Sequence, residues 1–210
     1  MLFRSIPVAK ALGETTIIAY EMNGEPLPHW HGFPARLVVP GWTGTYWVKH
    51  LTSIRAVTAP FTGFWMKSAY RLPSGKFPMV ERFFTQETIT TTPITEMMVN
   101  SLITSHTDGE TVRAGRVKIA GLAWDGGYGI RAVDVSTDGG EAWEPATLGE
   151  DLGRHAFRPW TYTLLARRGK STVTVRASNA LGQSQATSLI ANPAGYHHNL
   201  MQTVTLEVRR

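Results

Sequence analysis

The chain has 210 residues, of which 42% are hydrophobic and 18% are charged, a composition typical of a folded globular protein. Its formal net charge of +5 comes from 21 Lys or Arg and 16 Asp or Glu residues dispersed along the chain, which favours an anionic small molecule or an acidic protein partner over a nucleic acid. The sequence contains no cysteine, which excludes disulfides, thiolate catalysis and a cysteine-ligated metal within these residues.

The first twenty residues show neither a membrane segment nor a secretory signal. No apolar run anywhere in the chain approaches the roughly 20 residues of a membrane-spanning helix, and residues 1–10 lack the long apolar core of a signal peptide. Residues 15–20, Thr-Thr-Ile-Ile-Ala-Tyr, already have the character of a strand or buried segment. We therefore expect that the chain lacks its front part.

Residues 1–92 are irregular and rich in proline, glycine and aromatic residues. Short strands are predicted at Thr16–Tyr20, Arg36–Val39 and Ile54–Val57. A segment with so few periodic elements is predicted to be one side of a larger domain, built around a ligand or packed against further sequence.

Residues 93–210 have a different pattern, in which short alternating strands are separated by Gly-containing turns. Seven strands are predicted, at Met97–Thr104, Gly115–Ala123, Ile130–Thr137, Trp143–Leu148, Phe157–Ala166, Ser171–Ser178 and Gln202–Val208. Strands of this number and spacing indicate an immunoglobulin-like β-sandwich of about 115 residues. No helix of ten or more residues is predicted, so the fold class is mainly β.

The segment from His31 to Lys49 has the side chains needed to bind an anion. Gly32 allows a ligand to approach the backbone closely, and Pro34 fixes the backbone dihedral φ. Arg36 opens an apolar run, and the turns that follow it allow Lys49 to lie beside it. A planar guanidinium and a compact ammonium are well suited to one phosphate. Taken alone, however, these residues are explained better by simpler roles, with Arg36 and Lys49 as surface charges and His31 in a turn hydrogen bond.

Other candidate residues are weaker. His29 with His31, and His197 with His198, are pairs that could ligate a metal, but no third ligand follows at a recognisable spacing. Tyr70 could donate a hydrogen bond or act as an acid beside an oxyanion, although a lone tyrosine near tryptophan is usually core packing. Motifs typical of serine hydrolases, P-loop NTPases and dinucleotide-binding proteins do not occur.

Nearly the whole chain resembles the C-terminal half of the sulfite oxidase family of molybdoenzymes, most closely the bacterial sulfite:cytochrome c dehydrogenases. The motifs that carry the resemblance occur in the family's order, at Ala19–Pro28, His31–Arg36, Val39–Gly41, Trp47–Lys49, Trp65–Tyr70, Pro93–Glu96, Gly121–Gly127, Val133–Gly140 and Asn192–Tyr196.

The resemblance implies a fold and a set of site residues. Residues 1–92 would be the later, irregular α+β part of the molybdopterin domain, and residues 93–210 the immunoglobulin-like dimerisation domain. The residues that would contact the pterin and its phosphate are His31, Arg36, Trp47, Val48 and Lys49. Tyr70 would be the active-site tyrosine beside the metal's oxo group and the substrate.

The resemblance also implies a periplasmic enzyme that oxidises sulfite, or a similar small oxyanion, to sulfate with a molybdenum-molybdopterin cofactor and passes electrons to a c-type cytochrome. It implies a homodimer through residues 93–210, or association with a missing N-terminal half. Two features depart from the family: the molybdenum-ligating cysteine is absent, and Asn192-Pro-Ala-Gly195 stands where animal sulfite oxidases carry a substrate-pocket arginine. The alternative is a non-catalytic dimerisation or interaction module without a cofactor.

Overall fold

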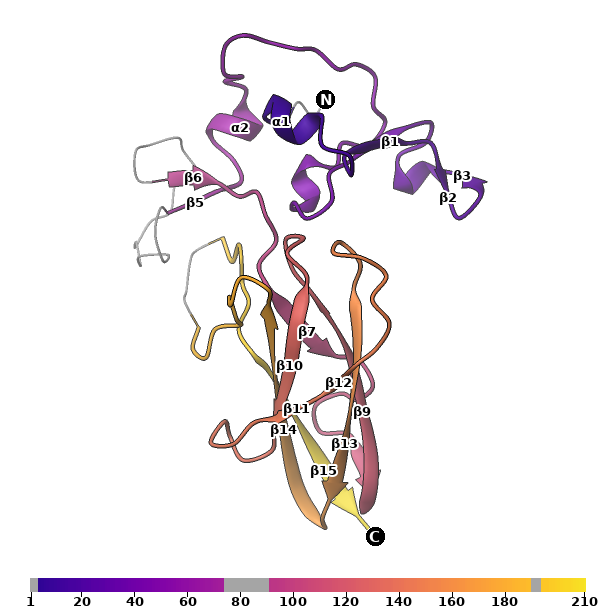
Figure 1. Ribbon diagram of the computed structural model, residues 1–210, viewed down its shortest axis with the longest axis vertical. Coiled ribbons are helices and arrows are strands. Elements are labelled where there is room, and N and C mark those ends of the chain that lie inside the picture. Colours follow the sequence, from indigo (N-terminus) through magenta and orange to yellow (C-terminus); the bar gives the residue numbers. More distant parts are fainter. Residues whose placement is uncertain (1–3, 74–90, 190–193) are drawn as a thin grey trace. The chain divides into compact units, whose positions relative to one another are not determined.

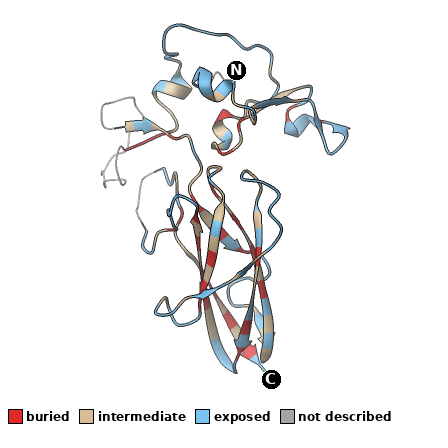
Figure 2. Ribbon diagram, viewed as in Figure 1, coloured by how far each residue is buried: buried red, intermediate tan, exposed pale blue. Residues whose placement is uncertain are grey.

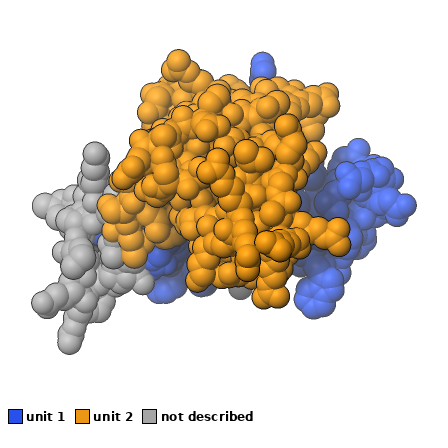
Figure 3. Space-filling model, turned by 90° about the horizontal axis from the view of Figure 1, so that it is seen from below, with its two compact units in different colours: residues 1–97, 190–197 blue, residues 98–189, 198–210 orange. Residues whose placement is uncertain are grey.

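The computed structural model describes residues 4–73, 91–189 and 194–210, and their regular structure is mainly β (Figure 1). The chain divides into two compact units, coloured separately in Figure 3. The first consists of Met1–Met97 with Ile190–His197, and the second of Met98–Leu189 with His198–Arg210. Within the described residues, no helix has the length and apolar character needed to cross a membrane.

The first unit is built from short elements joined by long irregular segments. Its helices and strands are α1 (Val8–Ala11), β1 (Ile17–Ala19), β2 (Glu21–Met22), β3 (Glu25–Pro26), β4 (Arg36–Val38), α2 (Phe64–Lys67), β5 (Arg71–Pro73) and β6 (Thr91–Pro93), with 3₁₀ turns at His29–His31 and Gly44–Tyr46. The strands form three two-stranded antiparallel pairs, β1–β4, β2–β3 and β5–β6.

Two of the three strands predicted in this unit are present, as β1 and β4. The prediction of a strand at Ile54–Val57 is wrong, because that segment pairs with no other described strand. Ile54 and Val57 remain 66% and 61% exposed, respectively. Side chains with high β-propensity do not form a strand without a neighbour that takes up their backbone hydrogen bonds and buries one face.

Among the described residues of the first unit, the buried apolar side chains are few and come from separate segments: Leu27, Val39, Tyr46, Leu72 and Ile94. Backbone hydrogen bonds join the early and late parts of this unit, from the N–H of Thr43 to the carbonyl of Thr95 (2.7 Å) and from the N–H of Met97 to the carbonyl of Gly41 (2.9 Å). The stretch 41–43, which lies between Arg36 and Lys49 in the sequence, is therefore hydrogen-bonded to residues 95–97.

The second unit is a sandwich of two sheets. Its strands are β7 (Asn100–Ile103), β8 (Thr111–Arg113), β9 (Gly115–Trp124), β10 (Ile130–Ser136), β11 (Glu144–Pro145), β12 (Thr147–Leu148), β13 (Arg158–Ala166), β14 (Gly169–Asn179) and β15 (Gln202–Arg209). One sheet has the order β11-β10-β14-β15-β8 and the other β12-β13-β9-β7. Adjacent strands in these two sheets pair antiparallel, except β15 and β8, which pair in parallel.

The seven strands predicted here are all present, with one division. The predicted strand Trp143–Leu148 becomes β11, which pairs with β10, and β12, which pairs with β13 in the other sheet. The chain changes sheets at Ala146, directly after Pro145, which has no N–H to continue a ladder. Strand β8 was not predicted from the pattern, and it pairs in parallel with the end of β15.

One apolar core lies between the two sheets. Valines of β10, β14 and β15 face Ile119 of β9 and Trp160 of β13, and the side chain of Trp160 is 1% exposed. Buried residues alternate with intermediate or exposed ones along much of these strands, as Figure 2 shows. This alternation is why the sequence pattern located the strands of this unit well.

Candidate functional site

The segment after the 3₁₀ turn His29–His31 is paired with the segment that contains Lys49. Three backbone hydrogen bonds join them: the N–H of Leu37 to the carbonyl of Val48 (2.9 Å), the N–H of His50 to that of Gly32 (3.3 Å), and the N–H of Leu51 to that of Ala35 (2.8 Å). The turns between the two segments thus return the chain on itself, and the predicted cations come to the same place.

Gly32 lies where the stems of the two cations meet. Its φ is +105°, in the left-handed region. A Cβ atom at this position would lie 3.0 Å from Cβ of Lys49 and 3.2 Å from Cβ of Arg36. Only glycine fits both the backbone conformation and the space. The structure therefore places Lys49 beside Arg36, as the turns between them had suggested.

The two cations are held by backbone carbonyls and an aromatic ring. Arg36 donates from Nη1 to the carbonyl of His31 (3.2 Å), and its guanidinium carbon lies 5.6 Å from the centroid of the Trp47 ring. Its Nε is buried and has no hydrogen-bond partner in the part of the chain that the structure describes. Lys49 donates from Nζ to the carbonyl of Trp30 (2.6 Å). The side-chain stem of each cation is thus fixed, and each cation retains N–H groups that can donate hydrogen bonds to a ligand.

The neighbouring aromatic residues are also fixed. Trp47 donates from Nε1 to the carbonyls of Val39 (2.8 Å) and Trp42 (3.2 Å), so its ring cannot rotate freely. The rings of His29 and His50 lie 4.8 Å apart. Across the described part of the chain, no group of three or more His, Asp or Glu side chains could hold a metal ion.

A cavity of about 710 Å³ adjoins this segment. It is lined by Gly44, Thr45, Trp47, Val48, Lys49, His50, Leu51, Thr52, Ser53 and Tyr70. Four of the six predicted site residues thus meet in one cavity: Trp47, Val48, Lys49 and Tyr70. His31 and Arg36 are not among its lining residues, although Arg36 contacts Trp47.

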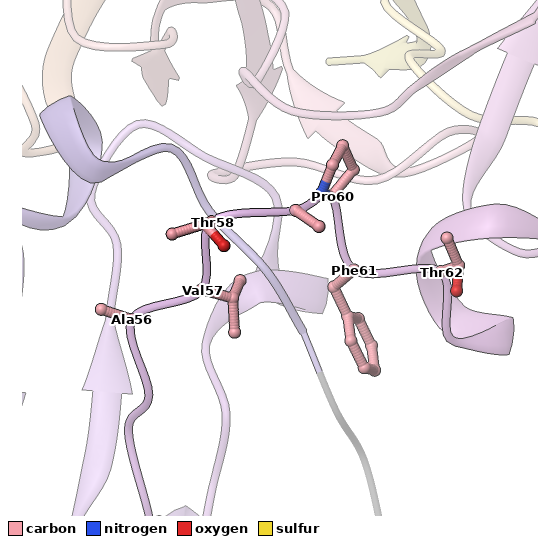
Figure 4. Close-up of a pocket in the computed structure, with 7 residues that line it drawn as sticks. Ala56, Val57, Thr58, Pro60, Phe61 and Thr62 are labelled. Carbon is pink, nitrogen blue, oxygen red and sulfur yellow. The ribbon is translucent and has the colours of Figure 1, made fainter.

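A second hollow, of about 510 Å³, lies within the loop of residues 56–62 (Figure 4). Its lining consists of alanine, valine, threonine, proline and phenylalanine. These residues supply no charge and no group that titrates near neutral pH. We therefore place the candidate site at the larger cavity.

Tyr70 has an unusual backbone conformation and is surrounded by other aromatic rings. Its φ is +55°, which is rare for a bulky residue and is maintained only where the surroundings impose it. Its carbonyl accepts a hydrogen bond from the N–H of Ile94 (2.9 Å). The centroids of the Trp65 and Tyr196 rings lie 5.8 Å and 6.0 Å from that of Tyr70.

Arg4 also contacts Tyr70, and no sequence pattern indicated this contact. Its guanidinium carbon lies 4.5 Å from the centroid of the Tyr70 ring and 4.9 Å from that of Tyr46. Nε donates to the carbonyl of Thr45 (2.9 Å), and Nη1 donates to the carbonyl of Trp65. Burial lowers the pKa of Arg4, and the surrounding phenols partly oppose this effect.

Arg71, next to Tyr70, is the most buried cation among the described residues of this unit, at 6% exposure. Each of its three nitrogens has a partner: Nη1 bonds the carbonyl of Met66 (3.1 Å), and Nη2 and Nε bond the carbonyl (2.9 Å) and hydroxyl (3.1 Å) of Thr91. Burial raises the pKa of Tyr46, while the positive charges of Arg4 and Arg71 act against that rise.

Four cations around the site are not neutralised by the described carboxylates. The ion pairs found among the described residues include Arg158–Asp151, Lys170–Glu207 and Arg176–Asp134, all in the second unit. Arg4, Arg36, Lys49 and Arg71 form no ion pair with any described residue and bond carbonyl or hydroxyl oxygens instead. The site therefore has an excess of positive charge, which favours an anionic ligand.

Two family models match the chain. The oxidoreductase molybdopterin binding domain matches residues 2–65, and the Mo-co oxidoreductase dimerisation domain matches residues 91–208. Arg36 and Lys49 lie within the first match, whereas Tyr70 lies between the two. Asn192 and Pro193, the first residues of the Asn192–Gly195 segment that the sequence analysis singled out, lie outside the described residues.

The chain is similar to proteins that oxidise sulfur compounds. It is 40% identical over 164 residues to human mitochondrial sulfite oxidase, covering 76% of this chain and 29% of that protein. It is 39% identical over 139 residues to sulfite oxidase of Arabidopsis thaliana, covering 66% of this chain and 34% of that protein.

Among solved structures, it resembles the sulfane dehydrogenase SoxCD from Paracoccus pantotrophus. The TM-score is 0.81 at 28% identity, over 96% of this chain and 51% of that one. The chain thus spans about a third or less of the two sulfite oxidases and about half of the SoxCD chain.

Proposed function

Because the chain belongs to the sulfite oxidase family of molybdopterin oxidoreductases, we propose that its first unit binds the pterin phosphate of a molybdenum cofactor and supplies the tyrosine of a sulfite-oxidising site. The observation that carries this proposal is the convergence of Arg36 and Lys49 on Gly32 beside a cavity that Tyr70 also lines. The second unit would be the immunoglobulin-like dimerisation domain.

The residues present fit a phosphorylated pterin. Gly32 is buried and lets the stems of the two cations lie close together, and the buried Nε of Arg36 has no acceptor among the described residues. A phosphate would supply that acceptor and neutralise both charges. The sequence contains no cysteine, so a thiolate ligand for the metal is not provided by these 210 residues.

When bound, the cofactor would supply two-electron redox chemistry and oxygen transfer at its metal. The chain's own residues would hold and orient it. Arg36 would bond the phosphate, Lys49 would add a point charge, and His31 and Val48 would contribute backbone around them. The Trp47 ring, fixed by its two hydrogen bonds, would form one wall.

Tyr70 would act on the substrate. Tyr70 lines the same cavity as Lys49, and we propose that its hydroxyl group donates a hydrogen bond to a sulfur oxyanion. Such a donor stabilises negative charge as it develops in the transition state. The positive charge of the unit would draw a sulfite dianion towards it. We propose oxidation of sulfite to sulfate, with a c-type cytochrome as electron acceptor and the periplasm as location.

The test is cofactor content together with turnover in protein purified from a host that makes the molybdenum cofactor. Arg36→Ala and Lys49→Ala should each lower the pterin released per chain several-fold, while Arg55→Ala, an exposed arginine of the same unit, should not. Sulfite-dependent reduction of a c-type cytochrome should fall in parallel. Wild-type protein that carries no pterin would refute the proposal.

Sedimentation addresses the proposed dimer, and it also separates the enzyme from a non-catalytic module. A homodimer that carries pterin is expected of the enzyme, whereas a dimer without pterin would favour the interaction module. A monomer at tens of micromolar would contradict self-association through residues 93–210.

A further inference from the structure

Side chains from three distant parts of the sequence gather around the Tyr70 ring. Arg4 comes from the N-terminal segment, Trp65 from α2, and Tyr196 from the segment 194–197 that belongs to the first unit. The group therefore contains two phenols and one guanidinium. It lies next to a cavity whose lining includes Tyr70 and Thr45, the residue whose carbonyl accepts from Arg4.

Arg4 is positioned firmly but is not saturated. Nε and Nη1 bond the carbonyls of Thr45 and Trp65, whereas Nη2 is buried and no described residue accepts a hydrogen bond from it. A buried donor without an acceptor is destabilising, and the cost is greater for a charged group. An anion that binds beside Tyr70 would supply both the missing hydrogen bond and the missing countercharge.

Comparison with Arg71 distinguishes this arrangement from a structural one. Arg71 is buried and its Nε, Nη1 and Nη2 all donate to Met66 or Thr91. An arginine that only holds the fold is expected to have a partner for each of its nitrogens, as Arg71 does. Nη2 of Arg4, in the same unit, has no partner among the described residues, and the guanidinium lies over the rings of Tyr46 and Tyr70.

Tyr196 is the second phenol, and the backbone around it is unusual. Gly195 and His197 have φ of +66° and +57°, on either side of Tyr196, and Tyr70 itself has +55°. Non-glycine residues with positive φ concentrate at functional sites. Burial and the neighbouring Tyr70 raise the pKa of Tyr196, and Arg4 opposes them only in part. The hydroxyl therefore stays protonated at neutral pH and can donate a hydrogen bond.

We propose that Arg4 is the residue that binds the substrate anion at this site, with Tyr196 donating a second hydrogen bond opposite Tyr70. The inference rests on the proposed function, because it assigns the anion as the sulfur oxyanion oxidised there. A pyramidal or tetrahedral oxyanion has three or more acceptor oxygens, enough for the guanidinium and both phenols. Tyr196 would then help to determine which small oxyanions are accepted.

The experiment measures sulfate binding to the purified, cofactor-loaded protein by calorimetry at fixed ionic strength, because sulfate is the unreactive product. The variants are Arg4→Gln, which keeps a donor but loses the charge, Arg4→Lys, and Arg55→Gln as control for net charge. We expect the Kd for sulfate to rise at least tenfold in Arg4→Gln, to recover partly in Arg4→Lys, and to be unchanged in Arg55→Gln. Pterin content should stay at the wild-type value in all three.

Two results would overturn the assignment. One is an unchanged Kd in a folded Arg4→Gln protein, and the other is a loss of pterin in that variant, which would give Arg4 a role in the fold or the cofactor site. If Arg4→Gln does not fold, as near-UV circular dichroism would reveal, Tyr196→Phe decides: a Kd raised at least threefold supports the proposal and an unchanged Kd overturns it. Sulfate affinity that depends on Arg4 in protein without pterin would refute the proposed function alone.

Discussion

A Cβ atom placed on Gly32 would lie 3.0 Å from Cβ of Lys49, closer than ordinary van der Waals contact. Lys49 cannot retreat easily, because its neighbours Val48 and His50 are hydrogen-bonded to Leu37 and Gly32. The absence of a side chain at Gly32 is therefore a condition for the two cations to lie together.

Gly32→Ala should disrupt cofactor binding. The new methyl group would displace the stems of Lys49 and Arg36, and alanine is strained at a φ of +105°. We expect a loss of about 1–3 kcal/mol in the free energy of unfolding and a several-fold decrease in pterin per chain. Urea unfolding and fluorescence of the released pterin would measure the two effects.

Gly24→Ala is the matched control for that substitution. Gly24 also has a positive φ, of +81°, but a Cβ atom there would meet nothing within 4 Å. It should cost similar backbone energy and leave the pterin content unchanged. If both variants lost pterin equally, the effect would come from general destabilisation and the close approach at Gly32 would have no specific role.

Tyr70→Phe should lower turnover with sulfite by more than tenfold, the usual size of a positioned proton donor's contribution. The ring remains, so its contacts with Arg4 and Trp65 are kept and pterin content should be unchanged. Steady-state kinetics would show a decrease mainly in kcat. Tyr20→Phe, at a phenol that is 66% exposed, should behave as wild type, and unchanged kinetics in Tyr70→Phe would remove that residue from the mechanism.

The sequence indicated the cations of the site because their arrangement is local. Arg36 and Lys49 are brought together by nearby glycine and proline turns, and such turns are visible in a single sequence. Arg4 gave no comparable signal. Its partner Trp65 is 61 positions away, and neither periodicity nor spacing reports a contact of that range.

In both units, the accuracy of the strand predictions depended on whether the predicted strand pairs with a neighbour and buries one face. In β14 the alternation at Val173, Val175 and Ala177 reflects one face buried in the core, so the sequence records the structure directly. At Ile54 and Val57 the same residue types are exposed and unpaired with any described strand. Isoleucine and valine favour β-strands, but no described segment provides the neighbouring strand with which these residues would have to pair.

Gly121→Ala should destabilise the second unit. A Cβ atom at Gly121 would overlap the carbonyl oxygen of Leu102 and the indole of Trp160, and neither can move without opening the β7–β9 pair or the core. We expect a cost of about 3 kcal/mol or more in the free energy of unfolding. Unfolding in urea, followed by tryptophan fluorescence, measures it.

Gly109→Ala provides the comparison, because it carries a backbone penalty that Gly121 does not. Its φ is +77° and a Cβ atom would contact nothing, so its cost should be about 1 kcal/mol. If Gly109→Ala were the more damaging of the two, the close packing of β9 against Trp160 would not be the limiting constraint.

The loop after β10 should give the second unit a pH-dependent contribution to stability. The pKa of Asp138 is lowered, first by hydrogen bonds from the N–H of Ala142 (3.0 Å) and then by the hydroxyl of Ser136 (2.8 Å). Since the folded state favours the carboxylate, its contribution is present above the ordinary Asp pKa of about 3.9. It is lost as the pH falls through the lower pKa of the folded protein.

Asp138→Asn tests this contribution, because the amide accepts fewer hydrogen bonds and carries no charge. The variant should be less stable than wild type at pH 7, and the difference in free energy of unfolding should shrink as the pH is lowered from about 4 towards 2. Glu141→Gln, which removes an exposed carboxylate from the same loop, should show no such convergence. If the difference between wild type and the Asp138→Asn variant stayed constant over this range, the side chain would stabilise the loop by its shape, with its charge contributing nothing.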